Sequence, residues 1–150
     1  MRKMANGTAV AWNGKAALIM GPPGAGKSDL ARRLIDQGAE LIADDLVELT
    51  RNGDQVMAAF PSDAPQELKG RIEARGLGII AVPAVDRPVA LALVIEATPA
   101  ADMPRMQKSE FYQWFDIDIP AVRLTLLETS TPTKVRLALG AISRSIIRPS

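Results

Sequence analysis

The sequence contains no cysteine and no histidine. Without cysteine, disulfides, thiolate nucleophiles and cysteine zinc sites are excluded. Without histidine, the chain lacks the commonest general base and the commonest metal ligand, so proton transfer must use carboxylates, lysine, tyrosine or water. No apolar run is long enough to cross a bilayer, and the basic N-terminal segment lacks the apolar core of a signal peptide. We therefore expect a cytoplasmic protein that does not bind membranes.

An excess of charge of either sign is also missing. Eighteen basic and 17 acidic residues leave a net charge of +1, which gives no sign of nucleic-acid binding. The 150 residues, 47% of them hydrophobic, are enough for one domain with a substantial core. We therefore expect residues 1–150 to form a single domain.

The hydrophobic patterns predict many strands and few helices around one strand–loop–helix unit, which is an α/β fold with a mixed β-sheet. The expected elements are strands at 8–12 and 15–20 joined by a turn at 13–14, a helix within 21–38, a strand at 39–44, a hairpin over 46–60 turning at 52–53, a loop with a helical turn at 61–70, strand segments within 71–83, a buried central strand at 87–98, a surface loop at 99–111, one or two edge strands at 115–129 and a helix at 132–147.

The stretch GPPGAGKS, residues 21–28, matches the phosphate-binding P-loop pattern G-x-x-x-x-G-K-[ST] in full and lies between an expected strand and an expected helix. Its glycines let backbone amides turn toward a phosphate, Lys27 can reach the β- and γ-phosphates, and the Ser28 hydroxyl can ligate Mg²⁺. The nucleotide-contacting residues expected from this pattern are Gly21, Pro22, Pro23, Gly24, Ala25, Gly26, Lys27, Ser28 and Asp29.

Two adjacent carboxylates, Asp44 and Asp45, end the next apolar run. Adjacent like charges repel each other, so the pair needs a reason to be there. A strand end or an Asx turn would be one reason. If the strand at 39–44 runs parallel to 15–20, however, the pair lies at the sheet edge that carries the P-loop. One carboxylate could then face Mg²⁺ and the other an acceptor hydroxyl.

The P-loop and Asp pair, followed by IEARGLGIIAVP at 72–83, resemble the bacterial HPr kinase/phosphorylase family. The resemblance is strong over about residues 6–83 and weaker beyond. It implies a P-loop kinase catalytic domain with the HPr kinase/PEP carboxykinase type of fold. It also implies that ATP and Mg²⁺ are used to phosphorylate a serine of the phosphocarrier HPr, that phosphorolysis can reverse this, and that the chain forms a homo-oligomer, in the family a hexamer.

The resemblance also implies roles for individual residues. Asp45 would be the base for phosphorylation and the acid for the reverse reaction, with Asp44 beside it as a metal ligand. Glu73 would be a further Mg²⁺ ligand, and Arg75 would support both reactions. Arg105, in MPRMQ, is the weaker match for an arginine of the family site.

Two departures from the family pattern keep alternatives open. Asn6 stands where the family usually has a histidine, and we expect the strand that holds it to pair with residues 15–20. Residues 127–134 contain one lysine and no arginine where the family's phosphorolysis loop is arginine-rich. One alternative is a catalytically weak nucleotide-sensing module, and another is a P-loop kinase acting on a small metabolite. The absence of an arginine-rich lid segment disfavours the second.

Overall fold

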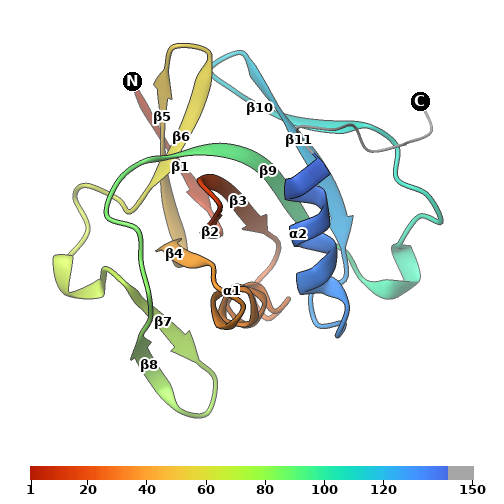
Figure 1. Cartoon of the computed structure of the whole chain (residues 1–150), viewed down its shortest axis with the longest axis horizontal. Coiled ribbons are helices and arrows are strands. Elements are labelled where there is room, and N and C mark those ends of the chain that lie inside the picture. The colour runs from red at the N-terminus through yellow and green to blue at the C-terminus, as the bar shows by residue number, and fades with distance from the viewer. Residues whose placement is uncertain (142–150) are drawn as a thin grey trace.

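The computed structural model describes residues 1–141, which form a curled mixed sheet with two helices packed on it (Figure 1). The elements in chain order are β1 Arg2–Asn6, β2 Thr8–Trp12, β3 Lys15–Met20, α1 Lys27–Asp36, β4 Glu40–Ala43, β5 Leu46–Asn52, β6 Gln55–Ala59, the 3-10 turn η1 Gln66–Leu68, β7 Arg71–Ala74, β8 Gly78–Ala81, β9 Val89–Ala97, the 3-10 turn η2 Ala100–Asp102, β10 Glu110–Trp114, β11 Ile117–Leu124 and α2 Thr131–Ala141.

Strand β9 is the centre of the nine-stranded sheet. The main path runs β1-β5-β6-β9-β3-β2-β4, and the β10–β11 hairpin joins it through β11. The beginning of β9 pairs with β6, whereas its end pairs with β11, as in Ala90 opposite Met57 and Val94 opposite Ala121. The sheet therefore branches along β9, while β3 follows its other side in parallel.

Buried apolar residues form one core on each face of this sheet. One cluster lies inside the curl and includes Leu18, Leu49 and Val94. The other includes Ile19 and Ile95 from neighbouring strands, together with residues of both helices. Because neighbouring side chains along a strand point to opposite faces, adjacent residues such as Leu18 and Ile19 supply different cores. Both helices thus cover one face, as Figure 1 shows.

Most of the expected elements are confirmed. The strands at 8–12 and 15–20 are β2 and β3, joined by a two-residue turn in which Asn13 and Gly14 both have positive φ. The central strand is β9, the helical turn in 61–70 is η1, and the segment 71–83 forms the β7–β8 hairpin. The helix expected at 132–147 is α2, and residues 142–147 of that prediction lie outside the described residues.

Three details of the expected elements are wrong. The second hairpin turns at Gly53–Asp54 rather than at Asn52–Gly53, because Asn52 still pairs with Gln55. The strand in 115–129 is not an edge strand, since β11 lies between β9 and β10. The edge strand β10 was missed: it begins in the last two residues of the expected surface loop, and its alternation of exposed and half-buried residues extends over only five positions.

Candidate functional site

The phosphate-binding loop spans residues 21–26, between the end of β3 and the start of α1. The helical ladder begins with the Leu30 amide, which donates to the Gly26 carbonyl at 2.9 Å. The amides of the first three helical residues have no helical acceptor and point out of the helix N-terminus, where the helix dipole also favours an anion. The Lys27 ammonium donates to the Gly21 carbonyl at 2.6 Å and so ties the two ends of the loop together.

Two glycines of this loop lie very close to other segments of the chain. A Cβ at Gly21 would lie 2.5 Å from the Ala97 Cβ, and one at Gly26 would lie 2.6 Å from Leu127 Cδ2. Gly26 also has φ of 101°, a left-handed conformation that favours glycine. The loop is therefore held against the end of β9 and against the segment that follows β11.

Asp29, one of the expected nucleotide contacts, is engaged elsewhere. Its carboxylate accepts from Arg32 at 2.8 Å and from Arg33 at 2.9 Å, both on the same helix. These ion pairs are only partly exposed and support the first turns of α1. What Asp29 retains for a phosphate is its backbone amide.

Asp44 is fixed by two hydroxyl groups on one oxygen. Ser28 Oγ and Thr8 Oγ1 both donate to Asp44 Oδ1 at 2.8 Å. This leaves the other carboxylate oxygen without a partner among residues 1–141. Thr8 is fully buried and escaped the sequence reasoning. Its only signal there was a hydroxyl within the otherwise apolar strand TAVAW.

Asp45 lies at a corner where the chain passes from one part of the sheet to another. Strand β4 pairs with β2, whereas β5, directly after the Asp pair, pairs with β1. Asp45 has φ of 72°, which is rare for a residue other than glycine. The Leu46 amide donates to the Asp44 carbonyl at 2.9 Å and the Gly7 amide donates to the Asp45 carbonyl at 3.1 Å. Backbone strain held by such contacts is typical of functional positions.

The predicted direction of the strand before the Asp pair is confirmed. β4 is antiparallel to β2, and β2 is antiparallel to β3, so β4 runs in the same direction as β3 with β2 between them. The C-terminal end of β4 therefore opens at the same edge as the P-loop, where open α/β sheets bind ligands.

A hollow of about 380 Å³ opens beside the Asp pair, and we call it the acidic hollow. It brings together four of the predicted site residues, Ser28, Asp44, Asp45 and Glu73. The rest of its lining is Leu41, Ala43, Leu46, Phe60, Pro61, Ala64, Leu68, Gly70, Arg71, Ile72 and Ile79. Ile72 is buried in the helix-side core, so β7 holds the neighbouring Glu73 at the hollow.

The acidic hollow fits Mg²⁺ bound together with a nucleotide rather than alone. Among residues 1–141, no three acidic side chains are grouped closely enough to hold a metal ion by themselves. Mg²⁺, however, commonly takes one or two protein oxygens and completes its shell with phosphates and water. The Ser28 hydroxyl and the free oxygen of Asp44 offer that number of ligands next to the P-loop.

Three other predicted site residues are not brought into the acidic hollow. Arg75 is exposed in the turn of the β7–β8 hairpin, and Arg105 is exposed in the loop before β10. Neither lines the hollow. Asn6 is exposed at the end of β1, opposite Leu46. The expectation that its strand pairs with residues 15–20 is wrong, because Gly7 separates β1 from β2 and only β2 pairs with β3.

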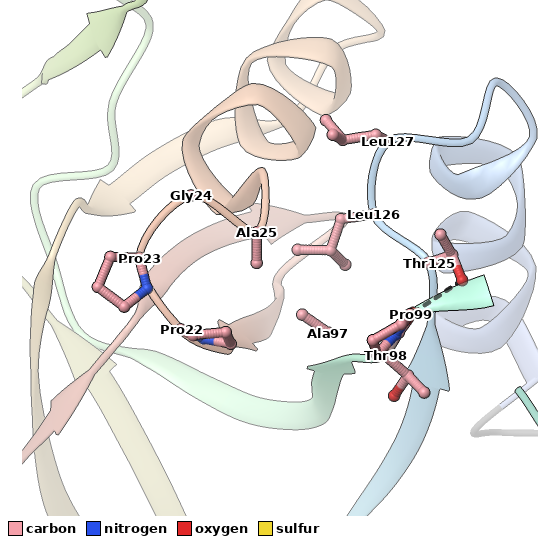
Figure 2. Close-up of a pocket in the computed structure, with 10 residues that line it drawn as sticks. All are labelled: Pro22, Pro23, Gly24, Ala25, Ala97, Thr98, Pro99, Thr125, Leu126 and Leu127. Atoms are coloured by element: carbon pink, nitrogen blue, oxygen red, sulfur yellow. Dashed lines mark hydrogen bonds between the residues drawn. The ribbon is translucent and has the colours of Figure 1, made fainter. Parts of the chain in front are cut away.

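A second hollow lies on another side of the P-loop, and we call it the apolar hollow. Its volume is about 300 Å³. Figure 2 shows the three segments that form it, the P-loop, the end of β9 and the segment after β11. Its lining is Pro22, Pro23, Gly24, Ala25, Ala97, Thr98, Pro99, Thr125, Leu126 and Leu127.

The structure places a P-loop and an Asp pair at one edge of a mixed sheet, as the resemblance implied. The model of the HPr serine kinase C-terminal domain matches residues 1–136. The chain belongs to this family. The match covers the P-loop, both hollows and the first part of α2.

Individual proteins that resemble this chain are named as members of the same family. It is 34% identical over 151 residues to the HPr kinase/phosphorylase of Lactobacillus johnsonii, covering 94% of this chain and 44% of that protein. It is 35% identical over 101 residues to the HPr kinase/phosphorylase of Bordetella pertussis, covering 63% of this chain and 32% of that protein. The chain thus spans less than half the length of these relatives.

The fold matches a solved structure as well. The Hpr(Ser) kinase/phosphatase from Coxiella burnetii superposes with a TM-score of 0.79 at 24% identity, covering 92% of this chain and 88% of that one. This confirms the mixed α/β fold of the HPr kinase type. Neither described helix is long and apolar enough to span a membrane.

Proposed function

We propose that this chain is an ATP- and Mg²⁺-dependent kinase that phosphorylates a serine of the phosphocarrier HPr. One observation supports the proposal above all. The acidic hollow brings together the Ser28 hydroxyl, the hydrogen-bonded carboxylate of Asp44 and the unpaired carboxylate of Asp45, whose backbone has a positive φ. Family membership supports the type of reaction, and the names of the relatives support HPr as the acceptor.

In this proposal the P-loop and its neighbours neutralise and align the triphosphate. Lys27 exchanges its contact with the Gly21 carbonyl for phosphate oxygens. Ser28 and Asp44 would hold Mg²⁺, with Glu73 of the same hollow as a further ligand. Phosphoryl transfer depends mainly on such positioning and charge stabilisation.

Asp45 is the proposed general base. Its carboxylate makes no hydrogen bond or ion pair with residues 1–141, so it is free to accept a proton from an incoming hydroxyl. Its position is nevertheless fixed, because the amides of Gly7 and Leu46 hold the backbone on both sides. As the serine oxygen bonds to the γ-phosphorus, its proton passes to the Asp45 carboxylate and ADP leaves. For the reverse reaction, protonated Asp45 would return the proton.

We further propose that residues 1–150 act as a single catalytic domain that assembles into a homo-oligomer in the cytoplasm. Arg75 and Arg105 are proposed to act from the acceptor side. Both are exposed and make no ion pair among residues 1–141, so they are available to a second protein.

The test is to incubate the chain with ATP, Mg²⁺ and HPr and to search HPr for phosphoserine by mass spectrometry. We expect phosphoserine with the wild-type chain and with Asp36→Asn, a matched control because Asp36 is an exposed carboxylate at the end of α1. We expect little with Asp45→Asn. Equal phosphorylation by Asp45→Asn and wild type would refute the assignment of the base.

A second candidate function, nucleotide sensing without turnover, is favoured by Asn6. This residue occupies the family's usual histidine position, and the next residue donates to the Asp45 carbonyl. Asparagine offers hydrogen bonds there but cannot exchange a proton near neutral pH. If ATP binds but neither the wild type nor Asn6→His yields phosphoserine-HPr, the sensing function is the better one. If Asn6→His raises phosphorylation or phosphorolysis, the kinase function is strengthened.

A further inference from the structure

Two hollows flank the P-loop, and they differ in chemistry. The acidic hollow holds the Ser28–Asp44 pair, Asp45 and Glu73, whereas no charged side chain among residues 1–141 lines the apolar hollow. If the reacting γ-phosphate faces Asp45, as the proposed function requires, the nucleoside must leave the P-loop in another direction. We propose that the apolar hollow holds the nucleoside of the phosphoryl donor and does not discriminate among bases. This inference rests on the proposed function.

The apolar hollow is continuous with the phosphate site. Four of its residues, Pro22–Ala25, belong to the P-loop itself. The end of β9 is pressed against this loop, since a Cβ at Gly21 would lie 2.5 Å from the Ala97 Cβ, and Leu127 lies beside Gly26. Figure 2 shows Ala25, Leu126 and Ala97 around the space between the loop and the opposite wall. A diphosphate in the loop therefore has an adjoining apolar surface on which a base and ribose can pack.

The volume of the hollow suits an occupant of nucleoside size. About 300 Å³ is at the lower end of the range for small-molecule sites, and such sites are mainly apolar. Leu127 is 62% exposed, although it is a large apolar side chain beside a loop that binds anions. A stacked base would cover it.

The hollow has few groups that could read a base. Within the described part of the chain, two of its side chains are polar, and both hydroxyls already donate to main-chain carbonyls: Thr98 to Glu96 at 3.1 Å and Thr125 to Thr98 at 2.8 Å. Three of the lining residues are prolines, which have no amide hydrogen to donate. The lining therefore offers contact area but no side-chain donor for a base edge.

Discrimination between bases needs polar groups matched to their edges. A site built to hydrogen-bond its ligand can reject an analogue by about 10⁴-fold, whereas a hydrophobic pocket tolerates polar changes that fit its shape. The apolar hollow is of the second kind. It predicts that adenine, guanine and cytosine nucleotides bind alike and that each binds more tightly than pyrophosphate.

The test is calorimetric binding of ADP, GDP, CDP and inorganic pyrophosphate to the whole chain with Mg²⁺. We expect the three nucleotides to agree within about 5-fold and to bind at least about 10-fold more tightly than pyrophosphate. Preference for one base by more than about 30-fold would overturn the lack of discrimination. Nucleotide affinities equal to that of pyrophosphate would overturn the nucleoside site while leaving the kinase proposal intact.

A matched pair of leucines locates the effect. We expect Leu127→Asn to lower the affinity for ADP and GDP about 5-fold or more and to change the affinity for pyrophosphate by no more than about 2-fold. The control is Leu137→Asn on α2, because Leu137 is 66% exposed and lines neither hollow. Leu137→Asn should leave the affinities for ADP, GDP and pyrophosphate unchanged. Equal loss of pyrophosphate and ADP in Leu127→Asn would place the effect in the P-loop and overturn the site. Failure of every ligand to bind wild type would overturn the kinase proposal and this one together.

Discussion

The acidic hollow and the apolar hollow share the P-loop but are built in opposite ways. The acidic hollow contains a left-handed aspartate, a carboxylate with one free oxygen and an exposed glutamate. In the apolar hollow, the two hydroxyls are bonded to main-chain carbonyls and the remaining side chains are apolar. The positive φ of Asp45 costs free energy in a residue other than glycine, and strain of this kind is typical of positions where chemistry is proposed to occur. The apolar hollow offers contact only.

The largest expected effect is the loss of function in both hollows at once. Lys27→Ala removes the cation that bridges the loop ends and is proposed to meet the phosphates. We expect nucleotide and pyrophosphate binding to fall beyond calorimetric detection and phosphorylation to disappear. Lys108→Ala, at an exposed lysine in the loop before β10, is the control and should bind normally. Unchanged ADP affinity in Lys27→Ala would remove the phosphate site from the P-loop.

The next effect separates the two hollows. Asp45→Asn should lower the rate of transfer to HPr by about 10²–10⁴-fold, the range for a lost general base, and leave ADP affinity within about 2-fold. Single-turnover transfer and calorimetry measure the two quantities. If Asp44→Asn gives this pattern instead, with Asp45→Asn unaffected, the assignment within the pair is reversed.

A smaller effect is expected from Thr8, which supports the acidic hollow from inside the sheet. Thr8→Val keeps the shape but removes a buried donor to the Asp44 carboxylate. We expect a loss of about 1.5–3 kcal/mol in unfolding free energy, as for a hydrogen bond to a charged group. The Mg²⁺ concentration for half-maximal transfer should rise about 10-fold, because partners of metal ligands affect metal affinity to this extent.

Thr8→Ser supplies the control for this substitution, since it keeps the hydroxyl. Restored Mg²⁺ dependence in Thr8→Ser would connect the effect to the hydrogen bond. If Thr8→Val lowers stability while the Mg²⁺ dependence stays unchanged, the bond has a structural role only.

The two hollows also differ in how far the sequence predicted them. Two local sequence patterns predict the acidic hollow: a complete P-loop and an unusual Asp pair at the end of an apolar run. Thr8 was missed because its partner Asp44 is 36 positions away and a single hydroxyl in a strand has many explanations. The pairing of residue 6 was predicted wrongly because the corner at Gly7 is a tertiary feature. A Cβ there would lie 2.6 Å from the Ile19 carbonyl oxygen, a contact that no local pattern reports.

Only one wall of the apolar hollow was predicted from the sequence, namely the P-loop residues 22–25. The other two walls lie near residues 98 and 126, in stretches that carry no recognisable motif. Only the parallel pairing of β9 with both β3 and β11 brings them to the same end of the sheet. Because parallel pairing joins segments far apart in sequence, the local alternation that predicts a strand does not predict its neighbours.

The smallest expected effect concerns the far side of the strand that closes the apolar hollow. Ala97 of β9 lines that hollow, while the preceding residue, Glu96, accepts a hydrogen bond from the Tyr112 hydroxyl. Burial, and after it this contact with Glu96, raises the pKa of Tyr112 to about 12. The folded chain therefore holds the phenolic proton more tightly than the unfolded chain does. The corresponding stability is complete below about pH 10, the ordinary pKa of tyrosine, and is lost as the pH rises from there through about 12.

Tyr112 is the chain's only tyrosine, so the ultraviolet absorbance of tyrosinate reports on this residue alone. We expect a titration midpoint near 12 in the native chain and near 10 in urea. In Tyr112→Phe, the unfolding free energy should decline less steeply between pH 10 and 12. The ADP affinity at neutral pH should be unchanged, because Tyr112 lines neither hollow. A native midpoint near 10 would mean that neither the burial of Tyr112 nor its contact with Glu96 persists in solution. The end of β9 would then be held mainly by its pairing with β3 and β11, and the apolar hollow would depend on those strands alone.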